Sequence, residues 1–299
     1  MEVFKTIGGV KSRIQIWDDP FYSGGKDVII CITGNPGIID FYYEFCSELS
    51  NSTGLPLCLI GQAGHDIFPD QLQISIKHNG HLFDLTGQIN HKVDLINNVI
   101  DKECNIHLIG HSIGAWLIIE ILKNHPEILR RVLSVNLLFP TIKEMAATTN
   151  GCYINNVIRK CNKLIMYLLV LLQILPTFIH KKLIRLYLIF VGLPMHYTNR
   201  LLKYTDPNIM EKVLFLAYKE MDKVRKLNVE GMQKIKQICN VIYGERDGWV
   251  PLYYMTELEQ FQPQLQMIKV PYPHDFVLRY SKEVAKLVKE FITPRLMKK

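Results

Sequence analysis

One stretch, residues 106–117, constrains the fold more than any other part of the chain. Its sequence, IHLIGHSIGAWL, has the pattern of a short apolar strand, a Gly-x-Ser-x-Gly turn and an apolar helix. Gly110 and Gly114 lie two positions either side of Ser112, where small residues let the strand and the helix approach each other. Chance occurrence is the alternative, although the flanking strand and helix make it less frequent. The stretch predicts a nucleophilic serine at a helix N-terminus, where free N–H groups and the helix dipole favour developing negative charge.

Strand and helix patterns alternate along most of the chain. Apolar strand-like runs occupy residues 27–32, 57–60, 106–111, 132–139, 240–243 and 266–270, after a hairpin pattern over 3–7 and 13–17. Helical patterns lie between or after them, at 38–50, 86–101, 115–123, 208–224 and 279–291. This alternation predicts an α/β fold with a mostly parallel central sheet and helices on both faces.

The loop Gly34-Asn35-Pro36-Gly37 directly follows the first buried strand. A glycine- and proline-rich loop at this place can present a backbone N–H to a reacting oxygen. Pro36 has no N–H, so we expect Asn35 and Ile113 to donate the two N–H groups of an oxyanion hole. A plain strand-to-helix turn is the alternative, because glycine and proline alone produce one.

Two residues near the C-terminus complete a candidate catalytic set. Asp247 follows an apolar strand, and His274 lies in the loop after the last strand. The chain order Ser112, Asp247, His274 is one of the known orders of a Ser-His-Asp triad. We expect His274 to take the Ser112 proton and Asp247 to orient the imidazole. In the alternatives, Asp247 caps the next helix, His274 is an ordinary loop residue, or Glu144 supplies the acid.

The alternation breaks at residues 164–193. The segment 164–179 is apolar on every side apart from two polar residues, and 183–193 is nearly so, with His180-Lys181-Lys182 between them. At ~1.5 Å per residue these runs reach about 24 and 17 Å, against a hydrocarbon layer of roughly 30 Å. An all-round apolar helix is buried in a large core or in lipid. Pro176 also interrupts the first run. Because neither run spans a bilayer comfortably, we expect shallow insertion.

Positive charge gathers in the same part of the chain. The net charge is +7, yet no acidic residue and eight basic residues lie between Glu144 and Asp206, which leaves 27 basic and 28 acidic residues elsewhere. Lysine and arginine at headgroup level are attracted to anionic lipid. We therefore expect this segment to contact a membrane or lipid surface. An ordinary helical cap buried on the core is the alternative.

The predicted organisation is a core in two parts, residues 1–143 and 231–299, with a helical cap at 144–230 between them that contains the apolar basic segment 164–193. No cluster of His, Cys and carboxylates has ligand spacing, so we expect no metal and no organic cofactor. The first 17 residues carry charges and no apolar signal region, and the seven scattered cysteines are typical of reduced thiols. No nucleic-acid partner is expected, and the oligomeric state stays open.

The motifs together resemble the lipid droplet-associated hydrolase family. The resemblance rests on GNPG followed by IIDFY at 34–42, on GHSIG at 110–114 and on PHDF at 273–276, and it covers nearly the whole chain. Thr33 departs from the proline expected before the first motif. The resemblance implies an α/β-hydrolase fold, Ser112, Asp247 and His274 as the catalytic set, and a place at lipid droplets and the cytosolic face of the endoplasmic reticulum.

The resemblance further implies a serine lipase or esterase that acts on neutral lipid esters, among them sterol esters. Two other functions stay open from the sequence. The chain could be a hydrolase-fold droplet factor that influences neutral lipid storage with little turnover, or a soluble hydrolase of small esters.

Overall fold

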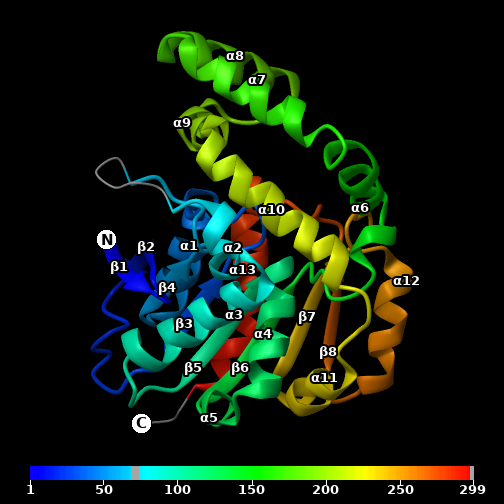
Figure 1. Cartoon of the computed structure of the whole chain (residues 1–299). Coiled ribbons are helices and arrows are strands. Elements are labelled where there is room, and N and C mark those ends of the chain that lie inside the picture. Colours follow the sequence, from blue (N-terminus) through cyan, green and yellow to red (C-terminus); the bar gives the residue numbers. More distant parts are fainter. Residues whose placement is uncertain (69–73, 297–299) are drawn as a thin grey trace.

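An eight-stranded sheet runs through the molecule in the order β1-β2-β4-β3-β5-β6-β7-β8 (Figure 1). The computed structural model describes residues 1–68 and 74–296. Strands β3 to β8 are parallel, and the β1/β2 hairpin joins β4 in antiparallel orientation. The strands are Glu2–Ile7 (β1), Val10–Trp17 (β2), Val28–Ile32 (β3), Leu57–Ile60 (β4), Ile106–His111 (β5), Val132–Leu138 (β6), Cys239–Gly244 (β7) and Gln266–Val270 (β8). The predicted mostly parallel α/β class is confirmed.

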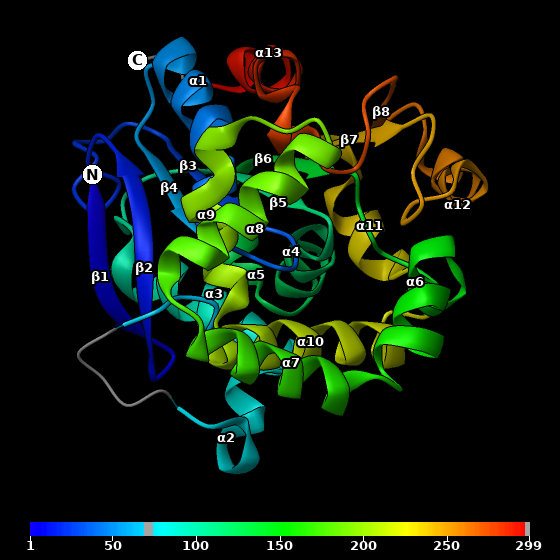
Figure 2. The ribbon, with the colours of Figure 1, turned by 90° about the horizontal axis from the view of Figure 1, so that it is seen from above.

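Helices cover both faces of this sheet (Figure 2). Alternate residues of β3 show the division, because Ile30 and Ile32 pack with α3 and α4 while Ile29 and Cys31 pack with α1 and α13. The core helices are Ile39–Tyr42 (the 3-10 helix η1), Tyr43–Thr53 (α1), Ile76–Phe83 (α2), Leu85–Asp94 (α3), Leu95–Val99 (the π-helix η2), Ile113–Asn124 (α4), Pro126–Leu129 (α5), Leu252–Met255 (α12) and Ser281–Ile292 (α13).

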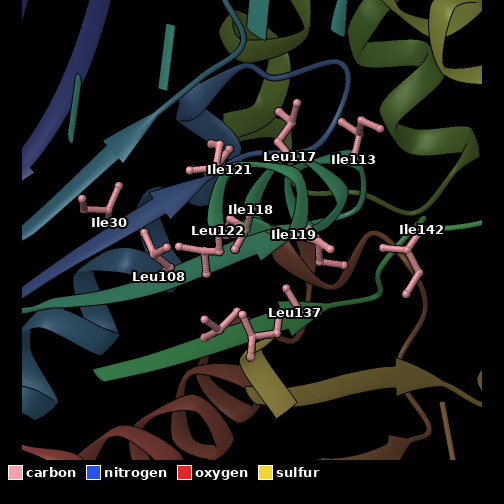
Figure 3. Packing of buried hydrophobic residues seen from close by; sticks show 14 of the residues in the cluster. Ile30, Leu108, Ile113, Leu117, Ile118, Ile119, Ile121, Leu122, Leu137 and Ile142 are labelled. Atoms are coloured by element: carbon pink, nitrogen blue, oxygen red, sulfur yellow. The ribbon is translucent and has the colours of Figure 1, made fainter. Parts of the chain in front are cut away.

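Helix α4 forms the centre of the larger core cluster. It lies over β5 and β6, and its aliphatic side chains meet theirs in Figure 3. Ile118, Leu122, Leu108 and Leu137 in this layer are all fully buried. Full burial of such a side chain stabilises the fold by about 1.5–3 kcal/mol. This packing holds the turn before α4, and therefore Ser112, on a rigid support.

A helical segment lies between β6 and β7 in the sequence. It consists of Thr149–Tyr153 (α6), Asn162–Ile174 (α7), Thr177–Phe190 (α8), Thr198–Leu202 (α9), Lys203–Thr205 (η6), Pro207–Lys223 (α10) and Val229–Ile235 (α11). Helix α11 packs against α4, while α7 contacts α10 and α8 contacts α9 as an outer layer away from the sheet (Figures 1 and 2). Helix α7 has no buried residue, and α8 buries only His180, Ile184 and Leu188.

The long apolar run divides at Leu175-Pro176, where Pro176 interrupts the first run as expected. His180-Lys181-Lys182, which we expected to separate the two runs, instead lies within α8. Proline lacks an N–H and restricts the residue before it, so it starts helices more readily than it continues them. His180 is buried and contacts the Leu172 carbonyl. Within residues 1–68 and 74–296, every helix is too short or too polar to cross a membrane.

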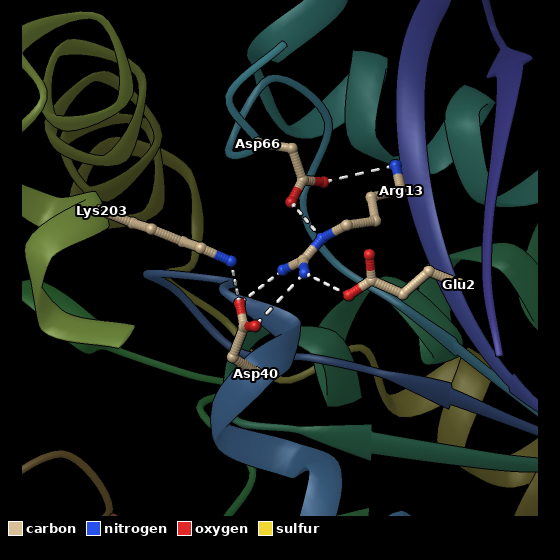
Figure 4. A network of polar contacts seen from close by, with 5 residues as sticks. All are labelled: Glu2, Arg13, Asp40, Asp66 and Lys203. Carbon is tan, nitrogen blue, oxygen red and sulfur yellow. Dashed lines mark hydrogen bonds and ion pairs between the residues drawn. The ribbon is translucent and has the colours of Figure 1, made fainter. Parts of the chain in front are cut away.

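Ion pairs join η6 and α9 of the helical segment to the core, and Figure 4 shows the one that involves η6. Arg13 of β2 contacts Glu2, Asp40 and Asp66, and Lys203 donates to Asp40 from the other side at 2.5 Å. Burial alone would raise the pKa of Asp40, but hydrogen bonds from Arg13 and Lys203 lower it to about 2. A second pair joins Arg200 of α9 to Glu44 of α1. Both acidic partners belong to the helices that follow the GNPG loop.

Candidate active site

Ser112 lies on a strained turn between β5 and α4. Its backbone has φ 56° and ψ −122°, a region that residues other than glycine rarely adopt. A Cβ at Gly110 would lie 2.6 Å from the Gly114 carbonyl oxygen, and a Cβ at Gly114 would lie 2.6 Å from that of Ile32. The crowding inferred from the Gly-x-Ser-x-Gly spacing is confirmed, because β3, β5 and α4 leave no room for side chains there.

The structure brings Ser112, His274 and Asp247 together at the carboxyl ends of the parallel strands. Ser112 Oγ lies 3.0 Å from His274 Nε2, and His274 Nδ1 lies 2.8 Å from Asp247 Oδ2. Ser112 follows β5, Asp247 follows β7 and His274 follows β8. Both contacts are within the range of about 2.6–3.2 Å that proton transfer between a nucleophile and its base requires.

The two carboxylate oxygens of Asp247 have different hydrogen-bond partners. Oδ1 accepts the backbone N–H groups of Trp249 and Val250 at 2.7 and 3.1 Å, whereas Oδ2 faces His274. Burial alone would raise the pKa of Asp247, but His274 and the two N–H donors hold it below its usual value. Asp247 does not cap the next helix, because its two N–H contacts precede α12, whose N-cap is Pro251. Glu144, the other candidate acid, is exposed, and its carbonyl oxygen accepts from Tyr254.

The loop after β3 lies directly against the serine. A Cβ at Gly34 would lie 2.9 Å from Ser112 Cβ, so only glycine allows this approach. In the part of the chain that the structure describes, the N–H groups of Asn35 and Ile113 donate no hydrogen bond. Ile113 is the first residue of α4, where N–H groups lack a partner in the helix. Two unused donors thus belong to residues on either side of Ser112, as an oxyanion hole requires.

Helix α10 holds the Asn35 side chain. Asn35 Nδ2 donates to the Val213 carbonyl at 3.1 Å and to Glu220 Oε1 at 2.9 Å. Burial raises the pKa of Glu220 to about 8, although the hydrogen bond from Asn35 opposes this shift. No motif in the sequence marks Glu220. The one available signal was that a glutamate occupies the apolar face of an amphipathic helix.

Two further residues near the serine were also missed. Gly34 N–H donates to Tyr42 Oη at 2.9 Å, Tyr42 Oη lies 2.6 Å from His111 Nδ1, and His111 Nε2 lies 2.9 Å from the His274 carbonyl oxygen. The position of His111 beside Ser112 was the only local signal, since Tyr42 and His274 reach it from other elements.

Ser112 and His274 open into a mostly apolar cavity of about 440 Å³. The GNPG loop and η1 form one side, and the helical segment forms the other through residues such as Tyr187 of α8 and Met221 of α10. Glu220 adds a carboxyl group to this wall. Within residues 1–68 and 74–296, no group of three or more His, Cys, Asp or Glu side chains could hold a metal ion.

The strand order, the strained serine turn and the Ser-His-Asp contacts define an α/β-hydrolase fold. A meta-cleavage product hydrolase from Pseudomonas fluorescens shares this fold, with a TM-score of 0.65 over 98% of this chain and 97% of that chain at 14% identity. A family model described as lipid-droplet associated hydrolase matches residues 25–277.

Two curated relatives carry the name lipid droplet-associated hydrolase. The protein from Drosophila melanogaster is 37% identical, and the alignment covers 97% of each chain. The human protein is 27% identical, over 99% of this chain and 96% of the relative. The chain belongs to the lipid droplet-associated hydrolase family, and the resemblance seen in its motifs is confirmed.

Proposed function

We propose that the chain is a serine ester hydrolase that acts on neutral lipid esters, such as sterol esters, at the surface of lipid droplets and on the cytosolic face of the endoplasmic reticulum. One observation carries this proposal. Ser112, in hydrogen-bond contact with His274, lines a cavity whose other walls are largely apolar. An apolar cavity with few convergent polar groups suits a lipid ester better than a polar substrate.

In this mechanism, His274 Nε2 takes the proton of Ser112 while Oγ attacks the ester carbonyl carbon. The N–H groups of Asn35 and Ile113 donate hydrogen bonds to the carbonyl oxygen and stabilise the negative charge that forms on it. The proton on His274 passes to the departing alcohol as the ester C–O bond breaks, and an acyl-serine remains. Water, deprotonated by His274, then releases the fatty acid. Asp247 stabilises the imidazolium cation in both steps.

The outer helices support a role at a lipid surface. Exposed apolar side chains repeat along α7 at residues 164, 167, 171 and 174 and along α8 at 183, 186 and 190, which is helical spacing. Lys160, Lys163, Lys181, Lys182 and Arg185 lie around them, with no acidic partner among the described residues. A surface that combines apolar stripes with positive charge suits an anionic lipid film. The name of the relatives points to the same location.

The first test combines an active-site probe with a substrate panel. A fluorophosphonate should label the folded protein, and Ser112→Ala should abolish labelling and lower ester turnover by about 10³-fold or more. Ser52→Ala, which changes a hydroxyl on α1, is the matched control and should label normally. The panel compares a sterol ester, a triacylglycerol, a monoacylglycerol and a thioester, each with and without a droplet surface.

Absence of labelling, with no ester cleaved by a protein that melts cooperatively, would overturn the enzyme proposal and favour a non-catalytic droplet factor. Cleavage of short esters alone, without affinity for droplets, would favour a soluble esterase.

A further inference from the structure

A continuous chain of hydrogen bonds runs behind the serine, from the GNPG loop to the loop that carries His274. It passes from Gly34 to Tyr42, from Tyr42 to His111 and from His111 to the His274 carbonyl, with distances of 2.9, 2.6 and 2.9 Å. Tyr42 and His111 are buried, at 5% and 6% exposure. Burying polar groups of this kind destabilises the fold unless each has a hydrogen-bond partner. Which atom donates and which accepts in each bond therefore matters.

The chemistry of the two ends determines that order. The His274 carbonyl can only accept, so His111 must carry its proton on Nε2. Burial lowers the pKa of His111 to about 3, with the nearby His274 acting in the same direction, so the ring is neutral and its Nδ1 is an acceptor. Tyr42 must then donate its hydroxyl hydrogen to Nδ1, and its oxygen remains free to accept the N–H of Gly34. Each hydrogen in the chain has one acceptor.

The two ends of this chain of hydrogen bonds belong to the loops whose relative position the proposed reaction requires to be fixed. Gly34 immediately precedes Asn35, whose N–H is the proposed oxyanion donor. The other end is the backbone of His274, the proposed base. The ring of His111 also packs against the His274 ring, with centroids 5.0 Å apart. The loops come from β3 and β8, and His111 of β5 lies between them beside Ser112.

We propose that Tyr42 and His111 are positioning residues that hold the oxyanion donor and the catalytic base at a fixed spacing around Ser112. The inference rests on the proposed function, because it assigns roles to Asn35 and His274. Neither residue has to contact the reacting atoms. Their effect falls on the rate of the chemical step rather than on substrate binding, because they set the geometry that the transition state needs.

The kinetic test removes one link at a time. Tyr42→Phe keeps the ring and removes both hydroxyl bonds, so we expect kcat and the rate of fluorophosphonate labelling to fall together by about tenfold, with KM changed less than twofold. His111→Asn keeps an acceptor near Nδ1 but is too short to reach the His274 carbonyl. We expect a similar loss, and the double variant should lose no more than the worse single variant.

Tyr254→Phe is the matched control, because Tyr254 is also a buried tyrosine whose hydroxyl donates one hydrogen bond, in its case to the Glu144 carbonyl outside the cavity. It should lower the melting temperature about as much as Tyr42→Phe without lowering kcat. His111→Gln, which can place an amide N–H near Nε2, should recover part of the activity lost in His111→Asn. Losses that multiply in the double variant, or equal kcat in Tyr42→Phe and Tyr254→Phe, would overturn the inference.

A spectroscopic measurement separates this inference from the proposed function. Nitrogen-15 NMR of labelled histidines should show His111 as a neutral ring with the proton on Nε2 between pH 5 and 9, in both the native protein and Ser112→Ala. A ring with its proton on Nδ1, or one that titrates in this range, would overturn the hydrogen-bond order. If His111 gives the expected NMR signal but the fluorophosphonate does not react with Ser112 of the native protein, the proposed function is overturned instead.

Discussion

At the scale of single residues, the environment decides what each carboxyl group near the site can do. Asp247 is surrounded by donors and keeps a lowered pKa, which suits a group that must stay ionised beside an imidazolium. Glu220 is 3% exposed, and Asn35 is its one hydrogen-bond partner among the described side chains, so its pKa is raised to about 8. At neutral pH the carboxyl group of Asp247 is therefore ionised, whereas that of Glu220 is protonated and neutral.

This difference predicts how stability responds to pH. An unfolded chain ionises Glu220 near its ordinary pKa of 4.5, whereas the folded chain keeps the proton up to about pH 8. Between these values the folded state binds the extra proton, so the contribution of Glu220 is fully present below pH 4.5 and is lost as pH rises to 8. Glu220→Gln removes this dependence. We expect its stability relative to the native protein to rise by a few kcal/mol from pH 5 to 8, measured by urea unfolding.

Glu211→Gln on the exposed side of the same helix is the control and should give a difference that does not vary with pH. A flat difference for Glu220→Gln as well would show that the carboxyl group is ionised in the folded state.

The sequence could suggest the residues that sit in motifs but not those that act through contacts. Ser112, Asp247 and His274 each follow a recognisable strand, so chain order alone placed them at one edge of the sheet. Tyr42 ends the motif at 34–42, but the motif does not reveal the contact with His111, and Glu220 lies on a helix face where an apolar residue would also fit. Their partners come from positions far away in the chain, and only the three-dimensional arrangement shows these contacts.

At the scale of elements, the turn before α4 depends on three segments meeting without side chains. Gly114→Ala would place a Cβ 2.6 Å from the Ile32 carbonyl and 2.8 Å from that of Thr33, both backbone atoms that cannot move alone. We expect a loss of about 2 kcal/mol or more in the free energy of unfolding, with a matching fall in labelling of Ser112.

Gly80→Ala on α2 is the control, because its nearest neighbour lies 3.4 Å away at the end of the Phe215 ring. A helical alanine there should be neutral or stabilise by up to about 1 kcal/mol. Equal melting temperatures for the two variants would contradict the close-packing argument.

Element boundaries followed the sequence wherever hydrophobic periodicity was strong. Strands β4 and β8 match their predicted bounds, and the amphipathic pattern over 208–224 became α10 with a shift of one residue at each end. The failure at 164–193 has a physical cause. An all-round apolar segment has no periodicity to show whether the charges at 180–182 end a helix, and the structure keeps them within α8, which begins after Pro176.

At the scale of the whole molecule, exposed apolar and positively charged side chains gather at one end. The outermost helices, α7 and α8, carry apolar stripes there together with basic residues that have no acidic partner among the described residues (Figure 1). The ion pairs of Asp40 and Glu44 fix these helices' neighbours to the core. This end of the molecule is the face that we propose to contact a lipid film, and Tyr187 of α8 also lines the cavity.

This orientation predicts which variants detach the protein from lipid. Leu186 and Phe190 of α8 are 64% and 89% exposed, so Leu186→Asp with Phe190→Asp should leave the fold intact. Because each aspartate must enter the film or lift the helix off it, we expect flotation with anionic vesicles or isolated droplets to fall at least tenfold. Activity on a short, water-soluble ester should persist.

Tyr22→Asp, at a loop position that is 85% exposed, is the control and should float like the native protein. Unchanged flotation of the α8 variant would place the attachment surface elsewhere on the chain.

Tyr187 of α8 and Leu193, which follows this helix, line the cavity. In the proposed arrangement, an ester in the lipid film would pass α8 into the pocket without first dissolving in water. Its turnover would then saturate with the number of ester molecules per unit area of film, not with their number per unit volume.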